Sequence, residues 1–347
     1  MTSPHKIERR KAYGGMILSE KLSEVWECYE MSISSMYKGR GMTVLRTDQG
    51  IRALRPLETS ESRLEQEAQL KEALYATGYH NTDRLIRNKD GELITCDRYH
   101  TPYVLKEYFE GRECNIHQEG DMIAAVLNLS DLHMALKEIQ PENVGKDLKV
   151  LKTFERHNQE MRRVRSYMRK IATKSEFDYL YLSCFDDFYN QGEAALRQLA
   201  AVHTEEGAGR RYYCHGAYHQ HNVLILKDGM ATVNFEHFMV DNQLTDLYTF
   251  LRKAMEKNDY QPELLFRLIE AYQQRIPLGR ADYQFIYYLL WYPEKFWKIS
   301  NQYNNMNKAW VPPKTYEKLQ TIIRQESGKR ELLRCYRERF GLNLQIT

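Results

Sequence analysis

A short segment of the chain places polar side chains at a spacing suited to phosphate chemistry. His215 is followed by Asn222, a strand expected over residues 223–226, a Lys-Asp-Gly turn, and a second strand expected over 231–235. Two apolar runs around an Asp-Gly turn predict a β-hairpin. Asn222 and Asn234 then stand at neighbouring ends of the hairpin, so their side chains should converge. Oxygen ligands brought together in this way are typical of a metal-phosphate site.

The segment resembles a motif of the aminoglycoside-phosphotransferase-like and choline-kinase-like branch of the protein-kinase fold. That motif is His-Gly-Asp, then four residues, Asn, and later a strand ending in Asp before an aromatic residue. The resemblance implies that the first Asp orients the acceptor hydroxyl, while the Asn and the second Asp hold Mg²⁺ against the phosphates of ATP. The three positions fall on Ala217, Asn222 and Asn234 in this chain.

Two of the three matching positions have lost the side chain that does the work. The methyl group of Ala217 cannot accept a proton, and loss of a general base costs roughly 10²–10⁴ in rate. Asn234 keeps an oxygen but carries no charge, whereas Mg²⁺ prefers carboxylate and phosphate oxygens. The substitutions predict a kinase-like site without catalytic activity.

Residues 31–57 predict the three-stranded start of such a fold, with turns at Gly39-Arg40-Gly41 and Asp48-Gln49-Gly50. The resemblance would put Gly39 and Gly41 in the loop over the phosphates, although an ordinary pair of hairpin glycines explains them equally well. The phosphate-binding lysine of the third strand falls on Arg55. Arginine is a planar fork and replaces a lysine poorly where a compact charge must fit between phosphates.

A helix is expected to follow this strand, starting at a capping box at Ser62 and ending near Ala76. By resemblance it carries the glutamate that pairs with the strand lysine; Glu67 is the candidate, with Glu65 and Glu72 close to it in facing. A solvated acidic face is the alternative explanation of its glutamates. A strand is expected over 103–108, and the run 103–112 fits the connection between lobes, where backbone groups would meet an adenine ring.

Several residues near the motif are candidates for supporting roles. By resemblance, His215 shapes the loop and Asp246 braces it with hydrogen bonds. His133, in an amphipathic helix expected over 121–134, is interpreted as a hydrogen-bonded core histidine. Histidine is the side chain suited to proton transfer near neutral pH, so His219 and His221 are the available replacements for the missing base.

An active enzyme would need rearranged ligands, with Glu236 or Asp241 holding Mg²⁺. Zinc is not favoured, because the six cysteines are scattered without a C-x-x-C pair and the histidines lack partners at fixed spacing.

The overall composition excludes some classes of function. With 42% hydrophobic residues in 347 and a net charge of only +3, the chain can bury a sizeable core and shows no bias towards nucleic acid or an anionic membrane. The run MRRVRSYMRK is interpreted as a solvated helix face, because its basic residues alternate at helical spacing with Val164, Tyr167, Met168 and Ile171. The amino-terminal MTSPHKIERRKAYGGMIL lacks a signal-peptide pattern, and no run has transmembrane length, so synthesis and folding in a cytoplasm are expected.

The carboxy-terminal third narrows the resemblance. Its aromatic block over 282–310 contains YPEKFWKI and the later Lys308-Ala309-Trp310, and DLYTFLRK begins at Asp246. These strings resemble the CotS family of bacterial spore coat proteins, over nearly the whole chain. That resemblance implies a kinase-like fold made in the mother cell and deposited in the spore coat, with other coat proteins as partners.

The expected fold is α+β and protein-kinase-like, with a small antiparallel-sheet lobe over 1–108 and a mostly helical lobe over 109–347 that contains the hairpin at 215–236. The function expected is that of an inactive kinase-fold protein that binds coat partners and uses no cofactor. Two alternatives stay open: an active small-molecule or polysaccharide kinase using ATP and Mg²⁺, and a nucleotide sensor that binds ATP without hydrolysis.

Overall fold

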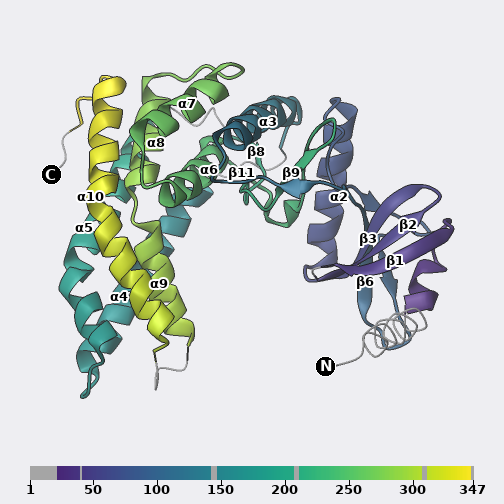
Figure 1. The fold of residues 1–347 in the computed structure, drawn as a ribbon, viewed down its shortest axis with the longest axis horizontal. Helices are drawn as coiled ribbons and strands as arrows, with labels where there is room; N and C mark the ends of the chain where they lie inside the picture. The colour runs from purple at the N-terminus through teal and green to yellow at the C-terminus, as the bar shows by residue number, and fades with distance from the viewer. Residues whose placement is uncertain (1–21, 40, 142–146, 207–210, 307–310, 345–347) are drawn as a thin grey trace, which may run out of the picture. The chain divides into compact units, whose positions relative to one another are not determined.

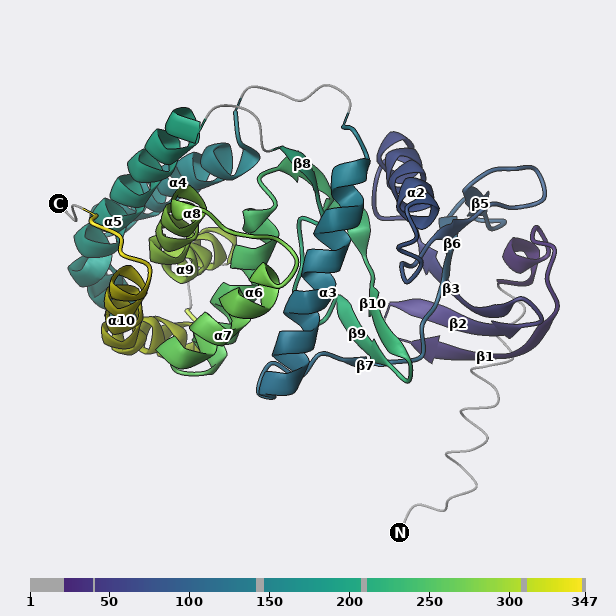
Figure 2. The same cartoon turned by 90° about the horizontal axis from the view of Figure 1, so that it is seen from above.

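Two compact units make up the chain in a computed structural model that describes residues 22–39, 41–141, 147–206, 211–306 and 311–344. The first unit comprises Met1–Glu113 with His221–His237, and the second comprises Cys114–Gln220 with Phe238–Thr347. Figures 1 and 2 show the secondary structure of each. The expected boundary between two lobes at residue 108 stays a prediction. The compact units end instead at Glu113, and His221–His237 group with the sheet.

An antiparallel sheet dominates the first unit, as expected for the small lobe (Figure 1). Its strands, among the described residues, are β1 (Ile33–Gly39), β2 (Met42–Thr47), β3 (Gly50–Pro56), β6 (Pro102–Glu107) and β4 (Leu85–Ile86) in spatial order, with β5 (Ile94–Cys96) also paired to β6. Ala53 of β3 lies opposite Lys106 of β6, so the two residues share one face of the sheet. Apolar side chains of the other face pack around Leu45, Leu54 and Leu105.

Strand β6 is an interior strand. It pairs with β3 along one edge and with β4 and β5 along the other. Neighbouring strands therefore take up the backbone hydrogen bonds of β6. The segment 108–112 follows directly after β6, and the expectation that the run 103–112 offers backbone groups to an adenine ring stays a prediction.

Helix α2 (Glu61–Ala76) packs in the same unit, where it was expected. Its cap is Ser60, whose side chain accepts a hydrogen bond from the backbone of Arg63, so the predicted cap at Ser62 is wrong by two residues. Leu64 and Ala68 of α2 pack against Leu93 and Val104.

The expected hairpin forms from β9 (Val223–Leu226) and β10 (Gly229–Thr232), and β7 (Arg112–Glu113) pairs with β9. The second strand ends at Thr232 and does not reach residue 235. Asn234 takes a left-handed φ of 65°, and a 3₁₀ turn follows over Phe235–His237. Asparagine tolerates this conformation better than most residues.

The second unit is mostly helical, and its long helices run beside one another in Figure 2. Its described elements are α3 (Glu119–Glu138), α4 (Lys149–Lys170), α5 (Glu176–Glu206), β8 (Tyr212–Cys214), β11 (Met239–Asp241), α6 (Leu244–Lys257), α7 (Pro262–Gln273), α8 (Arg280–Trp291), α9 (Glu294–Asn305) and α10 (Pro313–Arg339). Aromatic residues fill the core between α4, α5, α9 and α10, including Phe185 and Phe296, each fully buried. Most of the aromatic block is therefore packing, as expected.

No helix in the described part of the chain is both long and apolar enough to span a membrane. Three sequence interpretations lie outside the described residues: the amino-terminal segment, Arg40 of the glycine turn, and Lys308-Ala309-Trp310.

Candidate functional site

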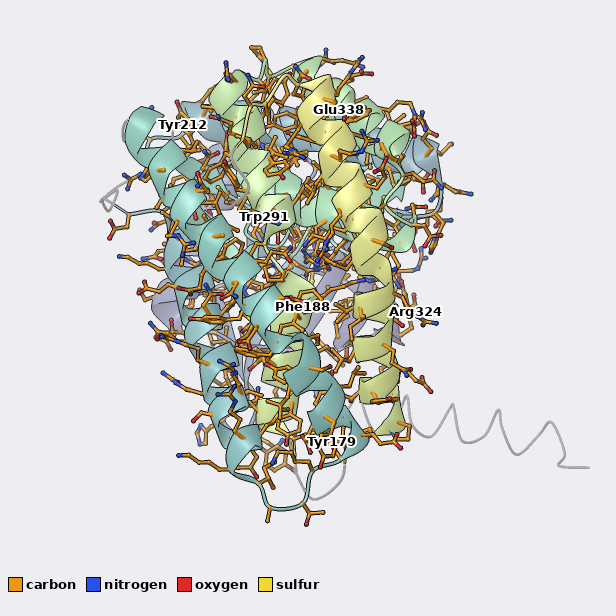
Figure 3. The ribbon with its side chains drawn as sticks, turned by 90° about the vertical axis from the view of Figure 1, so that its left-hand side faces the viewer. Tyr179, Phe188, Tyr212, Trp291, Arg324 and Glu338 are labelled. Carbon is orange, nitrogen blue, oxygen red and sulfur yellow. The ribbon has the colours of Figure 1, made fainter. Side chains whose placement is uncertain are left out.

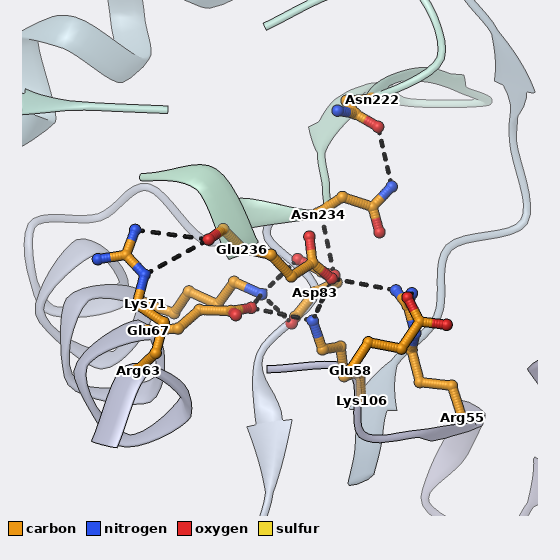
Figure 4. A network of polar contacts seen from close by, with 10 residues as sticks. All are labelled: Arg55, Glu58, Arg63, Glu67, Lys71, Asp83, Lys106, Asn222, Asn234 and Glu236. Atoms are coloured by element: carbon orange, nitrogen blue, oxygen red, sulfur yellow. Dashed lines mark hydrogen bonds and ion pairs between the residues drawn. The ribbon is translucent and has the colours of Figure 1, made fainter. Parts of the chain in front are cut away.

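The two asparagines of the hairpin meet, as their spacing predicts. Asn234 donates a hydrogen bond from Nδ2 to Oδ1 of Asn222 at 2.9 Å (Figure 4). The backbone N–H of Val233 donates to the carbonyl of Asn222, and the backbone N–H of Asn234 donates to Asp83. The two side chains therefore converge as expected, but they form a hydrogen bond with each other.

These residues do not fit Mg²⁺. The ion prefers carboxylate oxygens and releases its water reluctantly. Here the two asparagines are neutral, and Oδ1 of Asn222 already accepts a hydrogen bond. Over the described ranges, no group of three or more His, Cys, Asp or Glu side chains is placed to hold a metal ion.

A buried ionic network lies beside the asparagine pair within the first unit (Figure 4). Glu67 of α2 is fully buried and accepts hydrogen bonds from Lys71 at 2.6 Å and from Lys106 at 2.9 Å. Lys71 also forms an ion pair with Asp83 at 2.7 Å. Buried charges of this kind need partners, and removing one partner typically costs about 3–5 kcal/mol.

Glu67 was the predicted partner of the strand lysine, yet Arg55 does not contact it. Arg55 instead forms an ion pair with Glu236 at 3.0 Å and a longer one with Glu58 at 3.9 Å. The lysine that pairs with Glu67 comes from β6, on the strand next to β3. A lysine-glutamate pair is therefore present, but its lysine is Lys106 on β6 and not a residue of β3.

Glu236 joins the network from the 3₁₀ turn. Its Oε1 lies 3.0 Å from Nζ of Lys106 and 3.0 Å from Nη1 of Arg55. Burial alone would raise the pKa of Glu236, but Lys106 and Lys71 outweigh burial and lower the pKa to about 2. Burial would lower the pKa of Lys106, yet Asp83, Glu67 and Glu236 raise it above its ordinary value. Both groups are charged at neutral pH.

A pocket of about 380 Å³ opens beside this network, lined wholly by residues of the first unit. Its apolar lining includes Leu57, Leu64 and Val104. Its charged lining is balanced between three cations and three anions: Arg55, Arg63, Lys106, Glu58, Glu67 and Glu236. Arg63 also donates to the backbone carbonyl of Glu236 at 3.4 Å. A polyphosphate entering here would have to displace a carboxylate from its cations.

The loop at His215 is braced in the second unit as the resemblance implies. Asp246 accepts hydrogen bonds from the backbone N–H groups of His215 at 2.6 Å and Gly216 at 2.8 Å. The backbone N–H of Ala217 donates to Nδ1 of His215 at 3.2 Å. His133 is fully buried and hydrogen-bonded to Tyr272 and Asp246, so it is a core histidine, as predicted.

Two of the residues considered for a rearranged active site, Asp241 and His221, contact other groups. Asp241 belongs to the second unit and accepts hydrogen bonds from the backbone of Val150, at the start of α4, and of Asn242. His221 lies in the first unit against the carboxylate of Glu113. His219 falls in the second unit, and its catalytic role stays a prediction.

Two comparisons with known proteins bear on this fold and site. A family model described as "Spore coat putative kinase YutH" matches residues 23–336, which is most of the chain. The chain belongs to this family. The resemblance to kinase-like spore coat proteins is thereby confirmed.

Solved structures similar to this member of the spore coat kinase family are small-molecule kinases. An aminoglycoside phosphotransferase from Alicyclobacillus acidocaldarius aligns with a TM-score of 0.77 at 16% identity, covering 91% of this chain and 95% of that one. The amicoumacin kinase hAmiN aligns with a TM-score of 0.61 at 11% identity, covering 95% and 96%. A microcompartment-associated aminopropanol kinase gives 0.58 at 14% identity, covering 95% and 99%. At such low identity these matches show the fold alone, which is the expected phosphotransferase-like one.

Sequence reasoning missed Lys71 and Lys106, although both left a signal. Lys71 follows Leu64 and Ala68 at helical spacing, which places a charge on the buried stripe of α2. Lys106 ends the run Tyr-Val-Leu-Lys in a strand that reads as buried. A lysine at an interior position requires a carboxylate partner, and Glu67 was already a candidate.

Proposed function

We propose that this spore coat kinase family member is catalytically inactive and acts in the coat by binding other proteins. The observation that carries the proposal is that the polar side chains at the expected phosphate and metal positions are bonded to one another. Asn222 holds Asn234, and Lys106 is shared between Glu67 and Glu236. With a methyl group at Ala217, neither a proton acceptor nor a carboxylate for Mg²⁺ is supplied by the motif positions.

Thermal unfolding with ATP, with and without Mg²⁺, tests this proposal. A ligand at a hundred times its Kd stabilises the folded state by about 2.7 kcal/mol, which is a measurable rise in Tm. We expect no Mg²⁺-dependent rise and no release of ADP above a protein-free control. ADP release that disappears in Glu236→Ala would show an active enzyme and contradict the proposal.

Location in the spore is the second part of the proposal, supported by the name of the family. A fluorescent fusion expressed during sporulation should collect at the spore surface and not stay in the mother-cell cytoplasm. The same distribution is expected for Lys106→Arg, which keeps the positive charge of the network, because the proposed role needs no turnover. Retention of the unaltered fusion in the cytoplasm would contradict coat association.

One observation favours a second candidate, a sensor that binds a nucleotide without hydrolysis. The 380 Å³ pocket is open, and it is lined by Lys106, which pairs with Glu67. Lys106 lies on β6, the strand next to the one where the family motif expects the phosphate-binding lysine. For this candidate, ATP should raise the Tm even without Mg²⁺. The rise should vanish in Lys106→Met and persist in Lys89→Met, which alters an exposed lysine of the same unit.

A further inference from the structure

Helix α4 concentrates positive charge on one element. It carries eight lysines and arginines against two glutamates in 22 residues. The net charge of the whole chain is only +3, so the remainder of the chain is slightly negative. A cationic element on an otherwise balanced protein produces a local potential that attracts and orients an anionic partner.

The unpaired part of this charge lies on the outer face of α4. Val164 and Met168 point into the core, each at most 3% exposed. Four exposed cations spaced one, seven and eight residues apart share the opposite face and form what we call the basic stripe: Arg162, Arg163, Arg169 and Lys170. None of them forms an ion pair with any residue that the structure describes. Their neighbour Arg165, in contrast, is paired with Asp186 at 2.7 Å.

An exposed tyrosine lies at the edge of the basic stripe, with its ring 6.4 Å from that of Tyr303 in α9. Tyr167 follows Arg163 by four residues and precedes Lys170 by three, and 43% of its surface is exposed. Its predicted place was on the buried face, beside Met168. Tyr179, at 64% exposed, lies in the first turns of α5, just after the turn that ends α4 (Figure 3). Arginine and tyrosine are the residues enriched at protein interfaces and at their energetic centres.

We propose that the basic stripe with Tyr167 is a docking face for an acidic segment of a partner protein. The inference rests on the proposed function and identifies the surface through which the protein would bind its partner. Arginine pairs with carboxylates in a two-pronged geometry, and the tyrosine ring adds apolar contact at low entropic cost. The stripe spans about 12 Å along the helix axis, which matches about two turns of a helical acidic peptide or about four residues of an extended one.

A polypeptide fits this face better than nucleic acid. Nucleic-acid-binding domains usually carry a large positive net charge, whereas this chain is at +3 and the basic stripe lies on one helix. No second basic element is needed for a short acidic peptide, because the stripe supplies its counter-charges.

The test measures binding of a fluorescein-labelled oligoglutamate peptide to the full chain by anisotropy. The first variant reverses the basic stripe: R162E/R163E/R169E/K170E. The matched control reverses four exposed cations of α10 with the same change of net charge: K314E/K318E/R324E/R330E. A second stripe variant removes the four charges without reversing them: R162Q/R163Q/R169Q/K170Q. Melting curves of all variants check that each one is folded.

We expect the stripe variants to raise the Kd of the peptide at least about tenfold, and the α10 control to raise it by less than about twofold. Tyr167→Ala should weaken binding about threefold or more, and added salt should weaken the wild type but not the reversed variant. Equal loss in the stripe and α10 variants would overturn the proposal, because binding would then follow net charge alone.

The remaining outcomes are equally decisive. Absence of peptide binding to the wild type, or tighter binding of an oligothymidine of matched charge, would overturn the acidic-peptide assignment. Self-association abolished by the stripe variants and unaffected by the peptide would assign the face to a second copy of the chain and overturn it as well. ATP turnover by the wild type would remove the proposed inactivity and leave the docking result unchanged, so the two failures are distinguishable.

Discussion

Glu236 keeps its negative charge because the charges of Lys106 and Lys71 outweigh burial, which alone would raise the pKa and favour protonation. Lys106 and Arg55 each lie 3.0 Å from its Oε1. The pKa is lowered in the folded state, from 4.5 to about 2. This carboxylate therefore stabilises the fold fully above about pH 4.5, and that stabilisation is lost as the pH falls towards 2.

Glu236→Gln should lower the free energy of unfolding by about 2 kcal/mol at pH 7, because Lys106 and Arg55 lose a charged acceptor. The difference between wild type and variant should shrink between pH 4.5 and 2, the interval set by the two pKa values. Urea unfolding at a series of pH values measures it. Glu92→Gln, at an exposed position, is the control and should show neither effect. A difference that stays constant with pH would mean that the charge of Glu236 is unimportant.

The sequence identified part of this network and not the rest. Glu67 was found because a family motif points to a glutamate on that helix. Lys106 was not, because the motif assigns the cation to β3 and the residue there is Arg55. Motif alignment follows positions along the chain, whereas Glu67 needs a charge within hydrogen-bond distance, and two adjacent strands can supply it equally well.

At the scale of elements, Asp241 connects the end of β11 to the start of α4. Its carboxylate accepts hydrogen bonds from the backbone of Val150 and Asn242. Burial raises the pKa of Asp241 more than these two bonds lower it, to about 6. Its contribution to stability is therefore present in full below about pH 3.8 and is lost as the pH rises through 6.

Asp241→Asn should remove this pH dependence. The wild type should lose about 3 kcal/mol relative to the variant between pH 4 and 7, from a pKa displaced by about two units. Subtracting the two stability curves cancels the histidines, which both proteins share. Asp228→Asn, in the exposed hairpin turn, should follow the wild-type curve. Parallel curves for wild type and Asp241→Asn would show that Asp241 is ionised throughout.

Element boundaries were predictable where turn chemistry set them and not where tertiary contacts did. The Asp-Gly turn fixed β9 and β10, because glycine at 229 supplies a φ of 110°. The second strand stops at Thr232 because the backbone of Asn234 turns to meet Asp83, a residue 151 positions earlier. No local pattern carries that information.

The whole molecule buries many of its 25 tyrosines. Burial raises the pKa of Tyr272 and Tyr336 and raises that of Tyr287 to about 12. A tyrosine whose pKa is raised by folding stabilises the protein fully below about pH 10, and this contribution is lost as the pH rises through its folded value.

An alkaline titration followed at 295 nm should therefore show two phases. A fraction of the tyrosines should ionise reversibly near pH 10, and the rest should ionise only with loss of the far-ultraviolet circular dichroism signal. In strong denaturant all of them should titrate in one step. A single reversible step in the native protein would contradict the burial of these side chains.

The general architecture was accessible from sequence because it depends on many weak local signals that agree. Strand runs and helical spacings indicate a sheet followed by helices, and the resemblance at the 215–246 motif and in the aromatic block points to the phosphotransferase-like fold. The outward position of Tyr167 was not accessible, because its helical spacing is compatible with burial and only the packing of α4 decides it.

Buried charges fix the position of helix α2. In many regulated proteins a helix turns or slides between two resting positions, and the cost of each position is small. Here Glu67 and Lys71 occupy the inward face of α2 without solvent contact, tied to Lys106 and Asp83. Any rotation would strand two opposite charges in an apolar interior, which is far more costly than thermal motion can supply. The buried charges therefore hold α2 in a single position.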